Sequence, residues 1–63
     1  MNRRKIAIQI IVAEVAQEGI AGRCAIRAYV ESHMSAKTFH DAIRLGQRIY
    51  ERNHQPAFRD DSN

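Results

Sequence analysis

The sequence predicts a small all-α domain of three helices, and three observations lead to this prediction. Apolar residues recur every three or four positions over most of the chain, which is the spacing of a helix with one buried face. Gly19 follows the first such segment and Ser35 precedes the last one, where glycine ends helices and serine begins them. One cysteine among 63 residues excludes an internal disulfide, so the fold has to be stabilised by helix packing or by a second copy of the chain.

The first helix is expected from Ile6 to Glu18. One helical face then holds Ile8, Ile11, Val12 and Val15. The alternation of isoleucine with other residues over 6–12 also fits a β-strand, but the segment is longer than most strands, which favours a helix. Residues 1–5 precede this helix as a basic arm that contains Arg3, Arg4 and Lys5.

Two isoleucines of the first helix lie away from its main apolar face. Ile6 and Ile10 are one turn apart, beside polar residues. They predict a second contact surface, which is either a homodimer interface or a contact with the last helix of the same chain. The sequence does not distinguish between these two interpretations.

A second helix is expected from Arg23 to Ser32, after a short connection that contains two glycines. Its inward positions are predicted to be Ile26, Tyr29 and Val30. In the connection, Ile20 is expected to insert into the core. The lone Cys24 is expected to be a small buried apolar residue rather than a reactive thiol.

The third helix is expected from Ala36 to Asn53, with Ser35 as its N-cap. Met34, just before the cap, can pack against Phe39 one turn into the helix. The apolar face is predicted to hold Phe39, Ala42, Ile43, Gly46, Ile49 and Tyr50. Glycine on that face predicts close approach of another helix at Gly46. Residues 1–55 form one helical domain, and 56–63 are expected to be a disordered acidic tail.

The charge of the chain is positive and is carried mainly by arginine. The net charge is +3, and eight of the ten basic residues are arginine. Arginine binds phosphate and guanine through paired hydrogen bonds, so this composition favours nucleic acid as a partner. The sequence contains no secretory signal and no apolar run long enough to span a bilayer, which predicts a cytoplasmic, nucleoid-associated protein with no membrane partner.

The segment from Ala25 to Ile43 resembles a helix-turn-helix. It carries His33, Met34 and Ser35 in the turn, followed by Thr38-Phe39-His40 and Ile43. The run Met-Ser-Ala-Lys-Thr-Phe-His is similar to the start of the recognition helix in tetracycline-repressor-type regulators. It departs from that pattern at His33, where the family usually has glycine, and at Ser32, where an apolar residue is usual.

This resemblance implies a DNA-binding regulator of the kind that phages and plasmids encode, with the third helix in the major groove. The residues that would contact double-stranded DNA are Arg3, Arg4, Lys5, Ser35, Lys37, His40 and Arg44. Arg44 is the first choice for a guanine contact, whereas Ser35 and Lys37 are expected at phosphates. The basic arm would lie along the backbone or the minor groove.

Two alternatives remain open from the sequence. In a ribbon-helix-helix dimer, residues 5–12 would be a strand paired across a two-fold axis. In a protein-binding module, Ile6, Ile10 and Leu45 would contact a larger partner protein. Association with RNA is neither favoured nor excluded.

No catalytic role is expected for this chain, and no cofactor. The residues that could act as nucleophile, base or metal ligand are Cys24, His33, His40 and His54, and their spacing matches no zinc site. A domain of this size also has little room for a substrate pocket around a cysteine–histidine pair.

Overall fold

The computed structural model describes residues 2–54 and shows three helices. They are α1 (Arg3–Glu18), α2 (Arg23–Ser32) and α3 (Ala36–Asn53), and no strand occurs in this part of the chain. The predicted all-α fold is therefore confirmed. The ribbon-helix-helix alternative is wrong, because residues 5–12 are helical. The predicted acidic tail at 56–63 lies outside the described residues.

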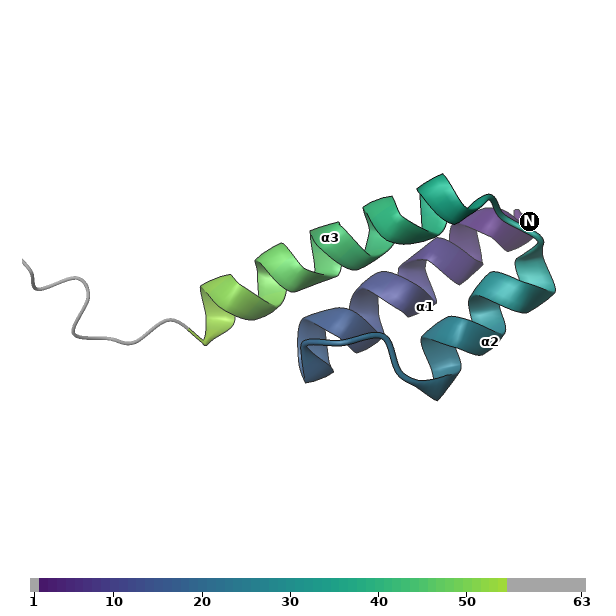
Figure 1. Cartoon of the computed structure of the whole chain (residues 1–63). Helices are drawn as coiled ribbons and strands as arrows, with labels where there is room; N and C mark the ends of the chain where they lie inside the picture. The colour runs from purple at the N-terminus through teal and green to yellow at the C-terminus, as the bar shows by residue number, and fades with distance from the viewer. Residues whose placement is uncertain (1, 55–63) are drawn as a thin grey trace, which may run out of the picture.

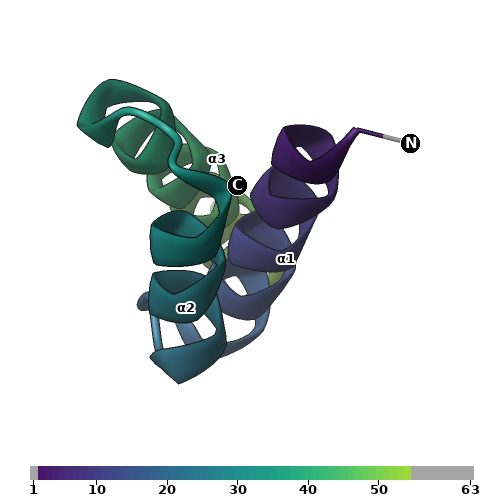
Figure 2. The same cartoon turned by 90° about the vertical axis from the view of Figure 1, so that its right-hand side faces the viewer.

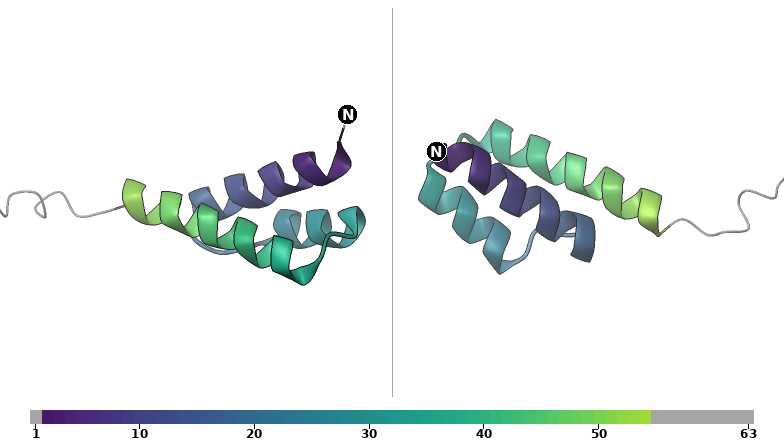
Figure 3. Two further views of the ribbon diagram at one scale, coloured as in Figure 1. Left: turned by 90° about the horizontal axis from the view of Figure 1, so that it is seen from above. Right: turned by 180° about the vertical axis from the view of Figure 1, so that it is seen from behind.

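Helix α1 is the centre of the domain. It packs against α2 along one side and against α3 along another, whereas α2 and α3 make few contacts with each other (Figure 1). The beginning of α1, the end of α2 and the beginning of α3 all lie at one end of the molecule (Figure 2). Figure 3 shows from above that α1 and α3 spread apart towards this end.

Helix α1 begins earlier than the sequence predicted. The side-chain oxygen of Asn2 accepts hydrogen bonds from the backbone N–H groups of Arg4, at 3.0 Å, and Lys5, at 3.2 Å. This N-cap places Arg3, Arg4 and Lys5 in the first helical turn, so the prediction of a basic arm was wrong for these residues. The other end of α1 agrees with the prediction: Gly19 has a left-handed backbone, with φ of 86°, and its N–H bonds to the Val15 carbonyl.

The contact between α1 and α3 is closest at Gly46. A β-carbon at this position would lie 2.6 Å from the Val15 Cβ and 2.9 Å from the Val12 carbonyl oxygen. Only glycine fits that space without separating the helices. The predicted close approach at Gly46 is confirmed, and Val15, which meets it, is fully buried.

The contact between α1 and α2 depends on a carboxylate. Oε1 of Glu14 accepts hydrogen bonds from the backbone N–H groups of Gly22, at 3.1 Å, and Ala25, at 2.6 Å. The N-cap residue Gly22 has no side chain to do this, so a side chain from α1 satisfies the exposed donors of α2. A negative charge also interacts favourably with the positive end of the helix dipole.

Helix α2 is rotated relative to the sequence-based prediction. Ala25 and Ala28 face the core, whereas Ile26 and Val30 are 52% and 60% exposed, so their predicted inward orientation was wrong. The small alanine side chains allow the α2 backbone to approach α1 closely enough for Glu14 to reach Ala25. Of the three residues predicted to point inward, Tyr29 alone packs against the core.

Two further burial predictions were wrong. Ile20 lies in the connection between α1 and α2 and is 67% exposed. Cys24 is exposed, because it lies with Arg23 on the outer side of the first turn of α2. Both residues are next to the segment that Glu14 holds, and the alanines of α2 occupy the inward positions instead.

The buried core is small for a domain of three helices. Its members are Ala7, Ile11, Val15, Ala25, Ala28, Met34 and Ala42. Four of these seven are alanines. Around them, the rings of Tyr29 and Phe39 stack with their centroids 4.2 Å apart, which joins α2 to α3 near the turn.

Candidate nucleic-acid interface

The turn between α2 and α3 is short and tightly hydrogen-bonded. His33 ends α2 in the left-handed region, with φ of 59° and ψ of 28°. The tetracycline-repressor-type regulators that this segment resembles usually have glycine at this position. The hydroxyl of Ser32 donates to the Tyr29 carbonyl at 3.2 Å and accepts from the N–H of Met34 at 3.3 Å. Met34 is buried, so the turn is held to the core by its central residue.

Ser35 caps the start of α3 as predicted. Its hydroxyl accepts from the backbone N–H of Thr38 at 3.2 Å and lies 3.0 Å from the Thr38 hydroxyl. Met34 belongs to the buried core, and the partly buried Phe39 packs against that core on the other side of the cap. The first turns of α3 therefore have a defined position relative to α1 and α2.

The outward side of α3 brings together several of the predicted contact residues. Its inward positions are Ala42 and Gly46, which are buried against the core. The exposed residues on the outward side include Lys37, His40, Asp41, Arg44, Leu45 and Arg48. We call these six residues the α3 face. Lys37, His40 and Arg44, which the sequence predicted as DNA contacts, thus lie on a single surface.

The α3 face carries more positive than negative charge. Lys37 pairs with Asp41, with 3.4 Å between Nζ and Oδ2, but both side chains are largely exposed. Within residues 2–54, Arg44 and Arg48 form no ion pair. Their guanidinium groups therefore retain all their donors for a ligand.

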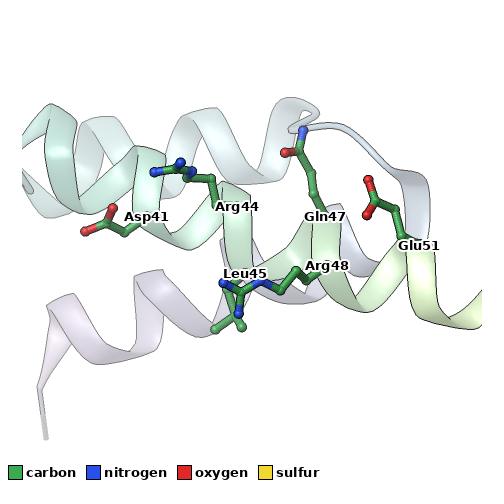
Figure 4. A pocket seen from close by; sticks show the side chains of 6 residues that line it. All are labelled: Asp41, Arg44, Leu45, Gln47, Arg48 and Glu51. Atoms are coloured by element: carbon green, nitrogen blue, oxygen red, sulfur yellow. The ribbon is translucent and has the colours of Figure 1, made fainter.

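The middle of the α3 face is open and lined by one helix only. Figure 4 shows six side chains that extend outward from α3 around this hollow: Asp41, Arg44, Leu45, Gln47, Arg48 and Glu51. With no second element to enclose it, this surface fits a large partner that lies against it better than a small molecule.

The sequence-based prediction did not include Arg48 among the DNA contacts. Its spacing of four residues from Arg44 places both on one helical face, and on its own this pattern also fits a solvated side chain. The structure places it beside Leu45 in the same hollow.

The other predicted contact residues are separate from the α3 face. Arg3, Arg4 and Lys5 are exposed on the first turn of α1, at the same end of the molecule as the start of α3 (Figure 2). Because they are helical, they cannot follow a DNA groove as an extended arm.

The three residues predicted for a dimer or partner interface do not form one surface. Ile6 and Ile10 line a groove between α1 and α2. Leu45 instead belongs to the hollow on α3. All three are exposed, as predicted, but a single contact patch made of all three is not what the structure shows.

The chain matches no family model, no curated protein and no solved structure. None of the three helices in residues 2–54 is long and apolar enough to cross a bilayer. The same residues hold no group of three His, Cys, Asp or Glu side chains that could bind a metal ion.

Proposed function

We propose that this chain binds double-stranded DNA through the α3 face, as a small regulator of the helix-turn-helix kind. The proposal is supported mainly by two arginines, Arg44 and Arg48, which form no ion pair within residues 2–54 and lie on the exposed side of a helix with a capped start. A helix with this surface fits the major groove of B-DNA, which is about 12 Å wide.

The proposed roles follow from the position of each residue along α3. Arg44 lies two turns from the helix start and can offer two hydrogen bonds to O6 and N7 of a guanine. Lys37 and the N-terminus of α3 lie nearer the groove edge, where they can contact phosphates. Asp41 lies between them and can accept from a cytosine amino group, which adds sequence preference.

The basic turn of α1 supplies additional positive charge in this proposal. Arg3, Arg4 and Lys5 lie at the end of the molecule where α3 begins (Figure 2). Helical side chains there can reach phosphates on the flanking backbone, which increases affinity without reading sequence.

The proposal is tested by fluorescence anisotropy with a labelled random-sequence duplex at two salt concentrations. We expect binding at low salt that weakens steeply as salt increases, because bound phosphates release counterions. Arg44→Ala should weaken binding by about 10-fold or more, because it removes the proposed contact inside the groove. Lys37→Ala removes a proposed phosphate contact, so it should lower the salt slope by about 1 and weaken binding less.

Arg23→Ala is the matched control, because it removes the same charge from the exposed start of α2 at the far end from the turn. It should change affinity less than Arg44→Ala does. No binding of the wild-type chain at low salt, or equal losses in the two arginine variants, would contradict the proposal and favour the protein-binding alternative.

A further inference from the structure

A groove with an apolar floor lies between α1 and α2, on a different side of α1 from α3. Its walls are formed by Arg3, Ile6, Ala7 and Ile10 from α1 and by Ala28, Glu31 and Ser32 from α2. Ile6 and Ile10 are 39% and 41% exposed, although each borders a buried alanine. The groove therefore leaves apolar side chains next to the core in contact with water.

The monomer buries few large apolar side chains and exposes many. Two large aliphatic side chains, Ile11 and Val15, are fully buried. Six large aliphatic side chains are exposed: Ile6, Ile10, Ile20, Ile26, Val30 and Leu45. A chain of this length is marginally stable even with a well-filled core, so burial of additional apolar surface against a partner would stabilise it substantially.

We infer that a second copy of this chain occupies the groove. Helices α1 and α2 run in opposite directions along it (Figure 1). A two-fold axis parallel to the groove therefore places each α1 against the α2 of the other copy, in antiparallel orientation. The result is a four-helix arrangement in which neighbouring helices alternate in direction, which is a common and stable way to pack helices.

The charges at the groove favour the same partner. Arg3 on α1 and Glu31 on α2 lie at the same end of the groove, because one is near the start of its helix and the other near the end. The two-fold arrangement brings each Arg3 close to the Glu31 of the other copy, so the surface is complementary to itself. Arg3 forms no ion pair within residues 2–54, and Glu31 makes a long, exposed one with Arg27, at 3.9 Å.

This interface leaves the α3 face exposed in both copies, because α3 packs on another side of α1 (Figure 2). The dimer and the DNA contact of the α3 face are thus separable properties, and Arg3, which the dimer pairs with Glu31, is shared between the two proposals. A dimer that binds no DNA would leave this inference intact and contradict the proposed function. A monomer that binds DNA would contradict this inference and leave the proposed function intact.

Sedimentation velocity or light scattering of the full chain tests the inference. We expect a concentration-dependent dimer whose dissociation constant increases by about 30-fold or more in Ile10→Glu, which places a charge among the apolar side chains of the groove. Ile26→Glu is the matched control, since Ile26 is exposed on α2 but does not line the groove. It should dimerise like the wild type.

Exchanging the charges of Arg3 and Glu31 provides a second test, which leaves the apolar floor of the groove unchanged. Arg3→Glu and Glu31→Arg should each weaken the dimer, and the double variant should restore most of the loss. A wild-type chain that is monomeric at about 1 mM, or a dimer equally tolerant of Ile10→Glu and Ile26→Glu, would overturn the inference. If the double variant does not recover the dimer affinity, the two-fold arrangement is overturned. Capture of a different protein by a monomeric chain would assign the groove to that protein.

Discussion

The two contacts that α1 makes are formed in different ways. Against α3, the helices are in direct van der Waals contact at Gly46, with Val12 and Val15 on the other side. Against α2, a hydrogen-bonded carboxylate at Glu14 and two alanines make the contact, and an open groove remains beside Ile6 and Ile10. The α1–α3 contact is formed by close packing at Gly46, whereas the α1–α2 contact is held at one end by the carboxylate of Glu14.

This difference affects how each of the two helices is held on α1. The close contact at Gly46 fixes α3 on α1, so the side chains on the α3 face have a defined direction. The contact with α2 is hydrogen-bonded near Glu14, and towards the start of α1 it leaves Ile6 and Ile10 exposed in a groove. Substitutions at the two contacts should therefore change the free energy of unfolding by different amounts.

The largest effect is expected at Gly46. Gly46→Ala would place a β-carbon 2.6 Å from the Val15 Cβ, which forces α1 and α3 apart. Alanine improves helix propensity by about 1 kcal/mol, but overpacking at a closed contact costs more, so we expect a net loss of about 2 kcal/mol. Urea denaturation followed by circular dichroism measures this loss.

Gln47→Ala is the control for the change at Gly46. It introduces alanine at the next position of α3, where the side chain is exposed, and should be neutral or slightly stabilising. A Gly46→Ala variant as stable as Gln47→Ala would show that α1 and α3 are not in close contact.

A smaller loss is expected at Glu14. Glu14→Ala removes the acceptor for the N–H groups of Gly22 and Ala25 and should lower the free energy of unfolding by about 1–2 kcal/mol. Glu14→Gln keeps one carbonyl acceptor and should lose less. Amide hydrogen exchange at Gly22 and Ala25 locates the effect.

Glu18→Ala is the matched comparison, because Glu18 is exposed in the last turn of the same helix. In the Glu18→Ala variant, the amide exchange rates in α2 should equal those of the wild type. If Glu14→Ala leaves exchange at Ala25 unchanged, the carboxylate does not cap α2.

The smallest effect is expected in the turn, and it has the opposite sign. His33 has a left-handed backbone with φ of 59°, which is costly for a residue with a β-carbon. His33→Gly should stabilise the domain by about 0.5 kcal/mol, after the greater flexibility of glycine in the unfolded chain is included. His33→Ala keeps the β-carbon and should give no such gain; equal thermal unfolding of the two variants would refute this explanation.

Much of the fold follows from local sequence. The ends of the helices at Gly19 and Ser35, the apolar face of α3 and the close approach at Gly46 were all predicted correctly. The helix ends and the apolar face depend on residues adjacent in the chain or one turn apart, where backbone preferences and helical period act directly. At Gly46 the local signal is a glycine on the apolar face, and the residues that approach it come from α1.

The same reasoning explains which parts of the candidate site were predicted. Lys37, His40 and Arg44 share the α3 face because their spacing follows the helical period. The separation of Leu45 from Ile6 and Ile10 depends on how α1 and α3 pack, which no local pattern specifies. The start of α1 was missed because Asn2 caps a turn composed of basic residues, where the apolar period has not yet begun.

The sequence by itself determined that the chain forms three helices, where α2 and α3 are joined, and which residues share the outward side of α3. Tertiary structure decided which side of α2 is buried, since both the isoleucine–valine side and the alanine side satisfy a helical period. The decisive interaction is long-range: Glu14 binds the N–H of Ala25, eleven residues away. Small side chains then allow close packing, and Ile26 and Val30 remain exposed to solvent.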